Sequence, residues 1–510
     1  MSSHISIPAK PDKTRLSLEE INNTIPVPEK SGFWRTLFAY SGPGALVAVG
    51  YMDPGNWSTS ITGGQNFQYL LMSIILMSSL IAMLLQYMSA KLGIVSQQDL
   101  AQAIRSRTSK PLALVLWVIT ELAIMATDVA EVIGGAIALY LLFHIPLVLA
   151  VFITVFDVLL LLVLTRIGFR KIEAIVVALI LVILVVFAYQ VALSNPDWSA
   201  VASGLIPRPE AFDSQHMVNG STALTGSLGI IGATVMPHNL YLHSSLTQSR
   251  QFDRKKKEAI QKAIRFSTWD SNIQLSVAFV VNALLLIMGV AVFKSGQVSD
   301  PSFFGLFDAL SRPEVLSNGV LEGLAKTGVL STLFAVALLA SGQNSTITGT
   351  LTGQIVMEGF LHLKLPLWLR RLVTRLLSLI PVLLAVVLTR SENVEQQHQA
   401  INMLLNNSQV FLAFALPFSM LPLLMMTNSR RMMGDFKNKL LVQVLGWLSV
   451  ASLIGLNILG LPDQIEDFFS EGQKLLADGL AYAIIAGILL LLAWTLLEFY
   501  KHNRQMTVEN

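Results

Sequence analysis

Two short polar stretches interrupt apolar segments of the sequence, and both contain residue types that can bind a cation. The first reads DPGN at residues 53–56, and the second reads MPHN at residues 236–239. Proline removes a backbone amide donor and glycine loosens the backbone, so each stretch is expected to break a helix. A carboxylate inside an apolar helix is costly, so a break beside Asp53 indicates a functional site.

The two breaks together offer a mixed set of metal ligands. Asp53 supplies an anionic oxygen, Asn56 a neutral oxygen and Met236 a thioether, and the freed carbonyl of Ala233 lies about one turn before Met236. Oxygens alone suit Na⁺, Mg²⁺ or Ca²⁺. A thioether adds more for Mn²⁺, Fe²⁺, Co²⁺ or Cd²⁺, so Met236 is interpreted as a selectivity device. The alternative is that Met236 only fills space, as methionines commonly do.

A second group of ionisable residues lies in one apolar segment. Glu121, Asp128 and Glu131 are spaced so that they stay within about 80° of one another on a helix. Charged side chains inside a membrane face the bundle interior and are typical of proton relays. His238, beside Met236, is a residue type that titrates near neutral pH and is suited to proton exchange.

Arginines in a later apolar segment complete this group. Arg371 and Arg375 are one helical turn apart and could pair with the acidic residues. A structural ion-pair network is the alternative interpretation, and for Glu121 and the arginines the sequence does not decide between the two. Asp157 could support the acidic group or line a cavity. His243 is interpreted as a packing or interfacial residue.

The composition is that of a protein that crosses a membrane many times. Of the 510 residues, 53% are hydrophobic and only 13% are charged, whereas soluble domains contain about 25% charged residues. The sequence has no cysteine, which excludes disulfides and thiolate metal sites. The net charge of +3 argues neither for nor against nucleic acid, and no nucleic-acid partner is expected. Because we find no nucleotide-binding loop, zinc-protease motif or nucleophile motif, no enzymatic activity is expected.

Apolar stretches of spanning length predict twelve transmembrane helices. They lie near residues 37–64, 68–93, 112–142, 146–166, 171–194, 222–248, 267–294, 324–360, 368–389, 402–426, 437–460 and 479–500. Lysine and arginine gather in alternate connecting loops, as in RKKK at 254–257, which predicts that both termini are cytoplasmic. The short tails and loops suggest a bacterial plasma membrane.

The two breaks occupy matching positions, each in the first helix of a block of five spans. Since five is odd, the second block enters from the opposite side, which predicts an inverted-repeat transporter with its site near the bilayer midplane. A pair of ordinary proline kinks would leave the accompanying acid, amides and histidine unexplained. The expected organisation is a cytoplasmic tail at 1–33, five-helix repeats at 34–194 and 222–430 with an extracellular loop at 195–221 between them, helices 11 and 12 at 431–502, and a cytoplasmic tail at 503–510.

These motifs, DPGN in the first span and MPHN in the sixth, resemble those of the Nramp family of divalent metal-ion transporters. The resemblance covers roughly residues 37–430. It includes LLQYMSAKLGIVSQQDLAQAI at 84–104, ELAIMATDVAEVIGGAIAL at 121–139, SGQNSTITGTLTGQIVMEGFL at 341–361 and RRLVTR at 370–375. It implies an all-α, leucine-transporter-like inverted repeat of 5+5 helices, with helices 1 and 6 broken and two further helices at the C-terminus.

The resemblance also implies a function and a site. Transport would be proton-coupled import of Mn²⁺ or Fe²⁺, and also of Cd²⁺ or Co²⁺, by alternating access. The metal ligands would be Asp53, Asn56, the Ala233 carbonyl and Met236. The proton pathway would include Glu131, Asp128, His238, Glu121, Arg371 and Arg375. Because metal ion and protons are cargo, no cofactor is implied; the lipid bilayer is the remaining partner, and no oligomer is required.

One departure from the family concerns the tenth span. The family usually has a second glutamine that, by the resemblance, closes on the metal in some states; here Gln409 is kept but Ala415 stands at the second position. Two rival interpretations are a Mg²⁺ carrier, which would be expected to lack the thioether, and a sodium-coupled amino-acid transporter of the same fold. A channel and a non-transporting metal receptor are further alternatives.

Overall fold

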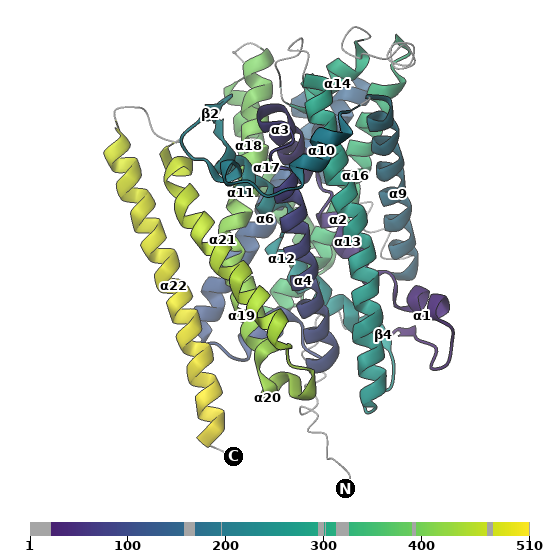
Figure 1. Cartoon of the computed structure of the whole chain (residues 1–510), viewed down its shortest axis with the longest axis vertical. Coiled ribbons are helices and arrows are strands. Elements are labelled where there is room, and N and C mark those ends of the chain that lie inside the picture. The colour runs from purple at the N-terminus through teal and green to yellow at the C-terminus, as the bar shows by residue number, and fades with distance from the viewer. Residues whose placement is uncertain are drawn as a thin grey trace.

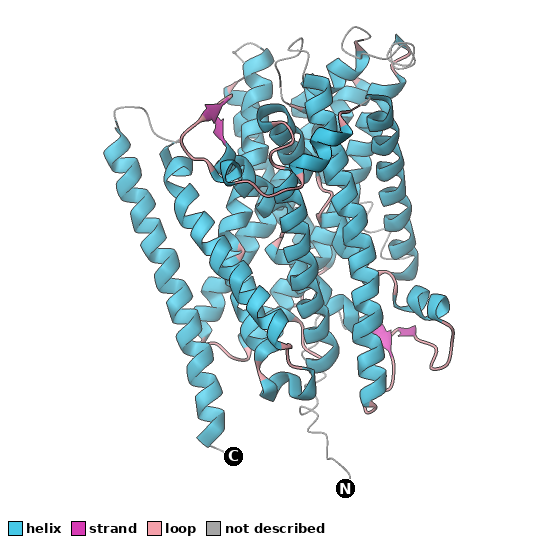
Figure 2. Cartoon of the chain, viewed as in Figure 1, coloured by secondary structure: helices cyan, strands magenta, loops and turns pink. Residues whose placement is uncertain are grey.

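The chain is almost entirely helical, and its long helices run side by side along the longest axis of the molecule (Figure 1, Figure 2). The computed structural model describes residues 22–157, 169–194, 196–293, 300, 302–312, 326–389, 394–466 and 473–508. Within these ranges, eight helices are long and apolar enough to cross a membrane. Part of the predicted fourth span, residues 158–166, lies outside the described residues.

The first half of the chain begins with a short strand and continues as helices. Its elements are β1 (Ile25–Pro26), α1 (Phe33–Tyr40), α2 (Pro43–Gly50), α3 (Pro54–Phe67), α4 (Met72–Ser96), α5 (Leu100–Arg105), α6 (Lys110–Phe143), α7 (Leu147–Ile153), η2 (Thr154–Phe156) and α9 (Phe169–Ser194). The first predicted span is therefore formed by α1, α2 and α3 together.

The second half contains the other broken span and the C-terminal helices. Its elements are α10 (Trp198–Gly204), η3 (Pro209–Phe212), β2 (Met217–Val218), β3 (Ser221–Thr222), α11 (Ala223–Thr234), α12 (Pro237–Leu246), η4 (Thr247–Ser249), β4 (Arg250–Gln251), α13 (Lys257–Phe293), α14 (Phe303–Ser311), α16 (Val329–Leu361), α17 (Leu367–Leu388), α18 (Val394–Ala415), α19 (Pro417–Asn428), α20 (Arg430–Met433), η6 (Gly434–Phe436), α21 (Leu440–Glu466) and α22 (Lys474–Val508). Residues 503–508, at the predicted C-terminal tail, are helical.

Both predicted helix breaks are confirmed, and proline chemistry explains their position. Between α2 and α3, Asp53 has an extended backbone (φ −73°, ψ 168°), and its side chain accepts the amide of Asn56 as the cap of α3. Pro54 follows as the first residue of α3, where its missing amide costs no helical hydrogen bond. Between α11 and α12, Met236 is extended (φ −69°, ψ 125°) and Pro237 opens α12 in the same way.

The broken helices lie inside the bundle, while the last two helices lie at its side. All residues of α2 and α12 are buried. By contrast, α21 and α22 pack against each other at one side of the bundle (Figure 1) and expose large apolar side chains such as Leu441, Leu475 and Leu490. Such exposed apolar faces are expected of helices that contact lipid rather than water.

Candidate metal site and ion-pair network

The two breaks meet at the side chain of Asn56. Its Nδ2 atom donates to Asp53 Oδ1 at 2.8 Å, to the Ala233 carbonyl at 2.8 Å and to the Gly50 carbonyl at 3.1 Å. An amide nitrogen carries only two hydrogens, so three oxygens converge where two donors are available. The structure thus brings together three of the four predicted metal ligands, from α3 and α11, around one point rich in acceptors.

One hydrogen-bond acceptor at this point, a carboxylate oxygen of Asp53, is unpaired among the described residues. Asp53 is fully buried, and its Oδ2 atom finds no hydrogen-bond partner among the described residues. A buried, unpaired carboxylate oxygen is costly unless a cation or proton satisfies it. Rotation of the Asn56 amide would turn its own oxygen toward Asp53 and Ala233, because the two amide atoms are nearly isosteric. A carboxylate, an amide oxygen and a backbone carbonyl would then face one cation.

The fourth predicted ligand, Met236, is fully buried at the start of α12. Its Sδ atom accepts from Asn239 Nδ2 at 3.7 Å. Its side chain packs in a small apolar cluster with Ala123, Leu412 and Ala415. Ala415 therefore contributes an apolar side chain beside the thioether, to which Asn239 makes a polar contact.

Two amide side chains that the sequence interpretation did not assign to the site lie against the breaks. Asn282 of α13 donates from Nδ2 to the Tyr51 carbonyl at 2.9 Å and contacts Asn56 Oδ1 at 3.4 Å. Gln409 of α18 fills the space beside Gly55, so closely that a Cβ at residue 55 would lie 2.2 Å from Gln409 Nε2. Within the described chain, neither amide oxygen has a hydrogen-bond partner. A polar side chain in an apolar span is the signal that could have identified them.

A buried network of charged residues joins α6, α17 and the end of η2. Arg371 pairs with Asp128 and, at 2.7 Å, with Glu131 Oε2; Arg375 pairs with Asp157 and lies 3.4 Å from Glu131 Oε2. All five side chains are at most 2% exposed. The structure thus brings four predicted pathway residues together, and it supplies Asp157 with the partners that the sequence left open.

The other predicted pathway residues lie apart from this network. Glu121 pairs with Arg370 rather than with Arg371 or Arg375, and it is 17% exposed. His238 is buried next to Met236, and its Nδ1 atom has no hydrogen-bond partner among the residues described.

His243, predicted to be a packing residue, takes part in a separate chain of hydrogen bonds. Its Nδ1 atom lies 3.0 Å from Gln86 Oε1, and Gln86 Nε2 donates to the Tyr51 hydroxyl at 2.8 Å. This chain leads back to the first break, since Tyr51 lies only two residues before Asp53.

Two helices connect the charged network to the first break. On α16, Ser341 Oγ donates to the Met52 carbonyl at 2.6 Å, and Ser345 Oγ donates to Glu131 Oε1 at 2.7 Å. Residues four apart lie on the same face of a helix, about 6 Å apart along its axis. On α6, Gly134 lies so close to Pro54 that a Cβ there would be 2.4 Å from the ring. Both α16 and α6 therefore contact the first break and the charged network.

The two ends of the broken helices differ in packing. A cavity of about 470 Å³ lies among α3, α11, α18 and the β2–β3 hairpin, and its lining includes Thr59 and Gly229, each about one turn from the site. At the other end, Asp270 of α13 accepts the amides of Gly42 at 3.2 Å and Gly44 at 2.8 Å. The described cavity thus lies at the hairpin end, about one turn from the site, whereas Asp270 holds α2 against α13 at the end where α1 and β4 lie (Figure 1).

Comparison with known sequences gives long matches. The family model described as natural resistance-associated macrophage protein-like (Nramp) matches residues 44–462. The divalent metal cation transporter MntH of Pediococcus pentosaceus is 56% identical over 442 residues, which cover 87% of this chain and 95% of that protein. The protein of the same name from Staphylococcus aureus is 51% identical over 445 residues, with 87% and 95% covered.

Solved structures agree with the fold. The manganese transporter of Eremococcus coleocola, in complex with an aromatic bis-isothiourea substituted compound, matches with a TM-score of 0.90 and 64% identity, over 96% of this chain and 100% of that chain. Mhp1, a nucleobase-cation-symport-1 family transporter, matches in a closed conformation with a TM-score of 0.51 and 17% identity, over 94% and 96%. The second likeness concerns the fold alone. Together they confirm the predicted leucine-transporter-like inverted repeat.

Proposed function

Since the chain belongs to the Nramp family, we propose that it is a secondary transporter that imports Mn²⁺, and related ions such as Fe²⁺, Co²⁺ and Cd²⁺, together with protons. The observation that carries this proposal is the convergence of Asp53, the Asn56 amide and the Ala233 carbonyl between two broken helices. Half-helices with freed backbone carbonyls at mid-bundle are a recurring way to replace the hydration shell of an ion. The names of its relatives support the same class of cargo.

Selection among divalent ions is assigned to Met236. Hard ions such as Ca²⁺ and Mg²⁺ prefer oxygen ligands. When a thioether replaces one of their bound waters, it compensates little of the free energy of dehydration. Softer transition-metal ions bind sulfur more strongly, so a thioether compensates more of their free energy of dehydration. Met236 is fully buried at the second break, where the neighbouring Ala415 offers no competing oxygen.

Proton coupling is assigned to the buried network around Arg371. Three carboxylates, of Asp128, Glu131 and Asp157, face two guanidiniums, of Arg371 and Arg375, so full ionisation leaves one negative charge in excess (3 − 2 = 1). An uncompensated buried charge is strongly unfavourable, so the network favours holding one exchangeable proton. Glu131 is the carboxylate tied through Ser345 of α16 to the helix that also contacts the first break.

The transport cycle proceeds by alternating access. The cavity beside Thr59 and Gly229 is the entry path, and we place it on the extracellular side with both termini in the cytoplasm. The metal ion reaches Asp53 from this cavity and loses most of its water between the breaks. The contacts of Asp270 with Gly42 and Gly44 then separate, so that α1 and α2 move away from α13 and open the opposite end.

The test uses the full-length chain in proteoliposomes with either a metal-sensing or a pH-sensing dye inside. Addition of Mn²⁺ outside is expected to give saturable metal entry that resists excess Ca²⁺ and Mg²⁺, together with acidification of the lumen. Metal entry without acidification would refute the proton coupling. Equal entry of Mg²⁺ would favour the Mg²⁺ carrier, and an absence of Mn²⁺ entry would refute the proposed cargo.

A further inference from the structure

The segment before α1 is held across the closed end of the bundle. We call residues 22–30 the N-terminal strap. Its strand β1 pairs in parallel with β4, so that Ile25 faces Arg250 and Pro26 faces Gln251. The amide of Asn23 donates to the Gln248 carbonyl at 3.0 Å, and further backbone contacts continue to residue 27. The strap therefore joins the loop between α12 and α13 by backbone hydrogen bonds.

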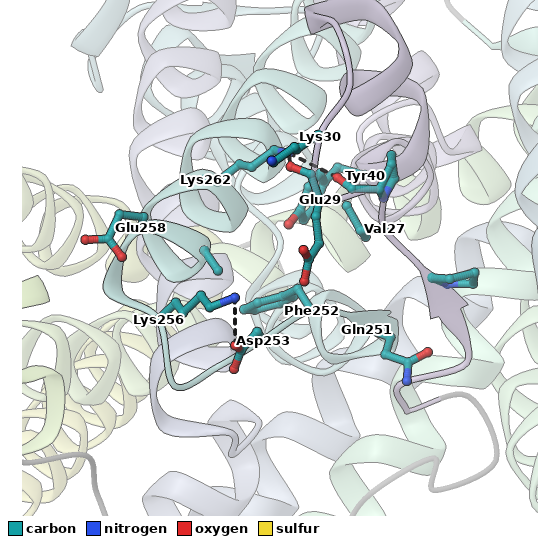
Figure 3. Close-up of a pocket in the computed structure, with 13 residues that line it drawn as sticks. Val27, Glu29, Lys30, Tyr40, Gln251, Phe252, Asp253, Lys256, Glu258 and Lys262 are labelled. Carbon is teal, nitrogen blue, oxygen red and sulfur yellow. Dashed lines mark hydrogen bonds and ion pairs between the residues drawn. The ribbon is translucent and has the colours of Figure 1, made fainter.

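The far end of the strap is fastened to α13. Lys262 Nζ donates to the carbonyls of Pro28 and Glu29, both at 3.1 Å, and Figure 3 shows Lys262 above this part of the strap. Val27 packs against a small apolar cluster of residues from α1, α4 and α13: Leu37, Tyr40, Ile94, Ala263 and Phe266. The strap is thus attached at both ends to elements that surround the closed end.

The strand that pairs with the strap carries Arg250, which contacts several elements of the closed end. Arg250 is 1% exposed, pairs with Glu173 of α9 at 3.0 Å, and donates to the carbonyl of Ala39 at 3.2 Å and to that of Ser41. One side chain therefore connects the end of α1, the α12–α13 loop and α9. The strap pairs with the backbone of β4, the strand from which this side chain extends.

Little chain separates the strap from α1. Residues 30–32 connect the carbonyls held by Lys262 to Phe33, the first residue of α1. Three extended residues span at most about 10 Å. A larger displacement of α1 from α13 must break the Lys262 contacts, and then the pairing of β1 with β4. Movement of α1 and release of the strap are therefore mechanically linked.

Part of the strap borders a cavity. A cavity of about 610 Å³ lies between it and the α12–α13 loop, lined by residues that include Tyr40, Phe252, Asp253, Lys256 and Lys262 (Figure 3). Residues 26–30 of the strap line this space. Its described attachments include a strand pair of only two residues, which is marginal by itself, together with the Lys262 contacts and the packing of Val27.

We propose that the N-terminal strap is a latch that stabilises the inward-closed state of the transporter and must release β4 each time the cytoplasmic end opens. This inference rests on the proposed alternating access of α1 and α2. It assigns residues 22–30 a role in the transport cycle.

The first test uses a reversible cross-link, which is clean because the chain contains no cysteine. Pro26→Cys with Gln251→Cys places two thiols on directly paired residues, and neighbouring strands lie about 4.8 Å apart, within disulfide range. Oxidation is expected to lower metal uptake at least about tenfold, and reduction to restore it. The matched controls are Pro26→Cys alone and Gln251→Cys alone, which keep each substitution but cannot form the cross-link between the strap and β4. Uptake that continues with the strap cross-linked would overturn the proposal.

The second test does not depend on transport. Ser271 is fully buried on α13, where its Cα would lie 2.8 Å from a Cβ at Gly44 of α2, so Ser271→Cys reports when α2 leaves. Lys262→Ala removes the contacts to Pro28 and Glu29 and is expected to raise the alkylation rate of that cysteine about fivefold or more. Lys255→Ala, in the loop just before α13, is the control. An unchanged alkylation rate in the Lys262→Ala variant would overturn the latch proposal, even if metal uptake is normal. A raised alkylation rate without any metal uptake would refute only the proposed cargo.

Discussion

Replacement of Glu131 by glutamine is expected to separate metal transport from proton transport. The change keeps the size of the side chain and most of its hydrogen bonding with Ser345 and Thr346, which lie 2.7 and 3.2 Å from the carboxylate. It also changes the balance of the buried network from three carboxylates against two guanidiniums to two against two. The excess charge that favours an exchangeable proton is then absent. We expect Mn²⁺ uptake within a few-fold of the parent protein, with lumen acidification close to background.

The stability of the protein should change little in the Glu131→Gln variant. At an effective dielectric constant of about 20, two unit charges 3 Å apart attract each other by about 5 kcal/mol. Glu131 has two such partners, at 2.7 and 3.4 Å, but the cost of burying its charge offsets most of this attraction. The net change in the free energy of unfolding should therefore stay within about 2 kcal/mol, and thermal unfolding in detergent measures it.

A matched control comes from the same helix. Glu121 pairs with Arg370, outside the deep network, so Glu121→Gln should leave acidification intact. Both variants are assayed with paired metal and pH dyes at one protein density. Parent-like acidification in the Glu131→Gln variant would refute the charge-balance reasoning, and loss of acidification in both variants would show that the two carboxylates act together.

Further predictions concern the metal site. Asp53→Asn removes the only anionic ligand in the set, so Mn²⁺ uptake should fall to background while the variant still folds, as monitored by size-exclusion chromatography. Met236→Ala should weaken Mn²⁺ and Cd²⁺ uptake and let excess Ca²⁺ or Mg²⁺ compete better; unchanged competition would contradict the soft-ligand role. Gly55→Ala places a methyl group against Gln409 and should reduce uptake at least about tenfold, whereas Gly479→Ala, whose Cβ meets nothing within 4 Å, should have no effect.

The helix breaks were predictable because their cause is local. A proline after an extended residue fixes the start of a helix whatever packs around it. The same local signals located Asp53, Asn56 and the Ala233 carbonyl. The resemblance to a known family grouped them into one predicted ligand set. Long apolar stretches likewise indicated the spans, although α13 begins at Lys257, ten residues before the predicted start at residue 267.

Features that depend on distant partners could not be predicted in the same way. Asp157 and Arg375 are 218 residues apart, and no spacing rule connects an acid in one span with a guanidinium in another. Asn282 meets the first break only because α13 packs against α3. The strap contains a strand of only two residues, which is too short to produce a detectable alternation of polar and apolar side chains.

The arrangement of α16 explains how one cargo could influence the other without direct contact. Ser341 donates to the carbonyl of Met52, directly before the proposed metal ligand Asp53, and Ser345 donates to Glu131 one turn away. A packed helix transmits a shift of one of these contacts to the other, because close-packed interiors deform little. Movement of the first break when a metal ion binds would therefore alter the hydrogen bonding of Glu131. Since the charge balance of the network depends on that carboxylate, its tendency to hold a proton would change with metal occupancy, which is the linkage that coupled transport requires.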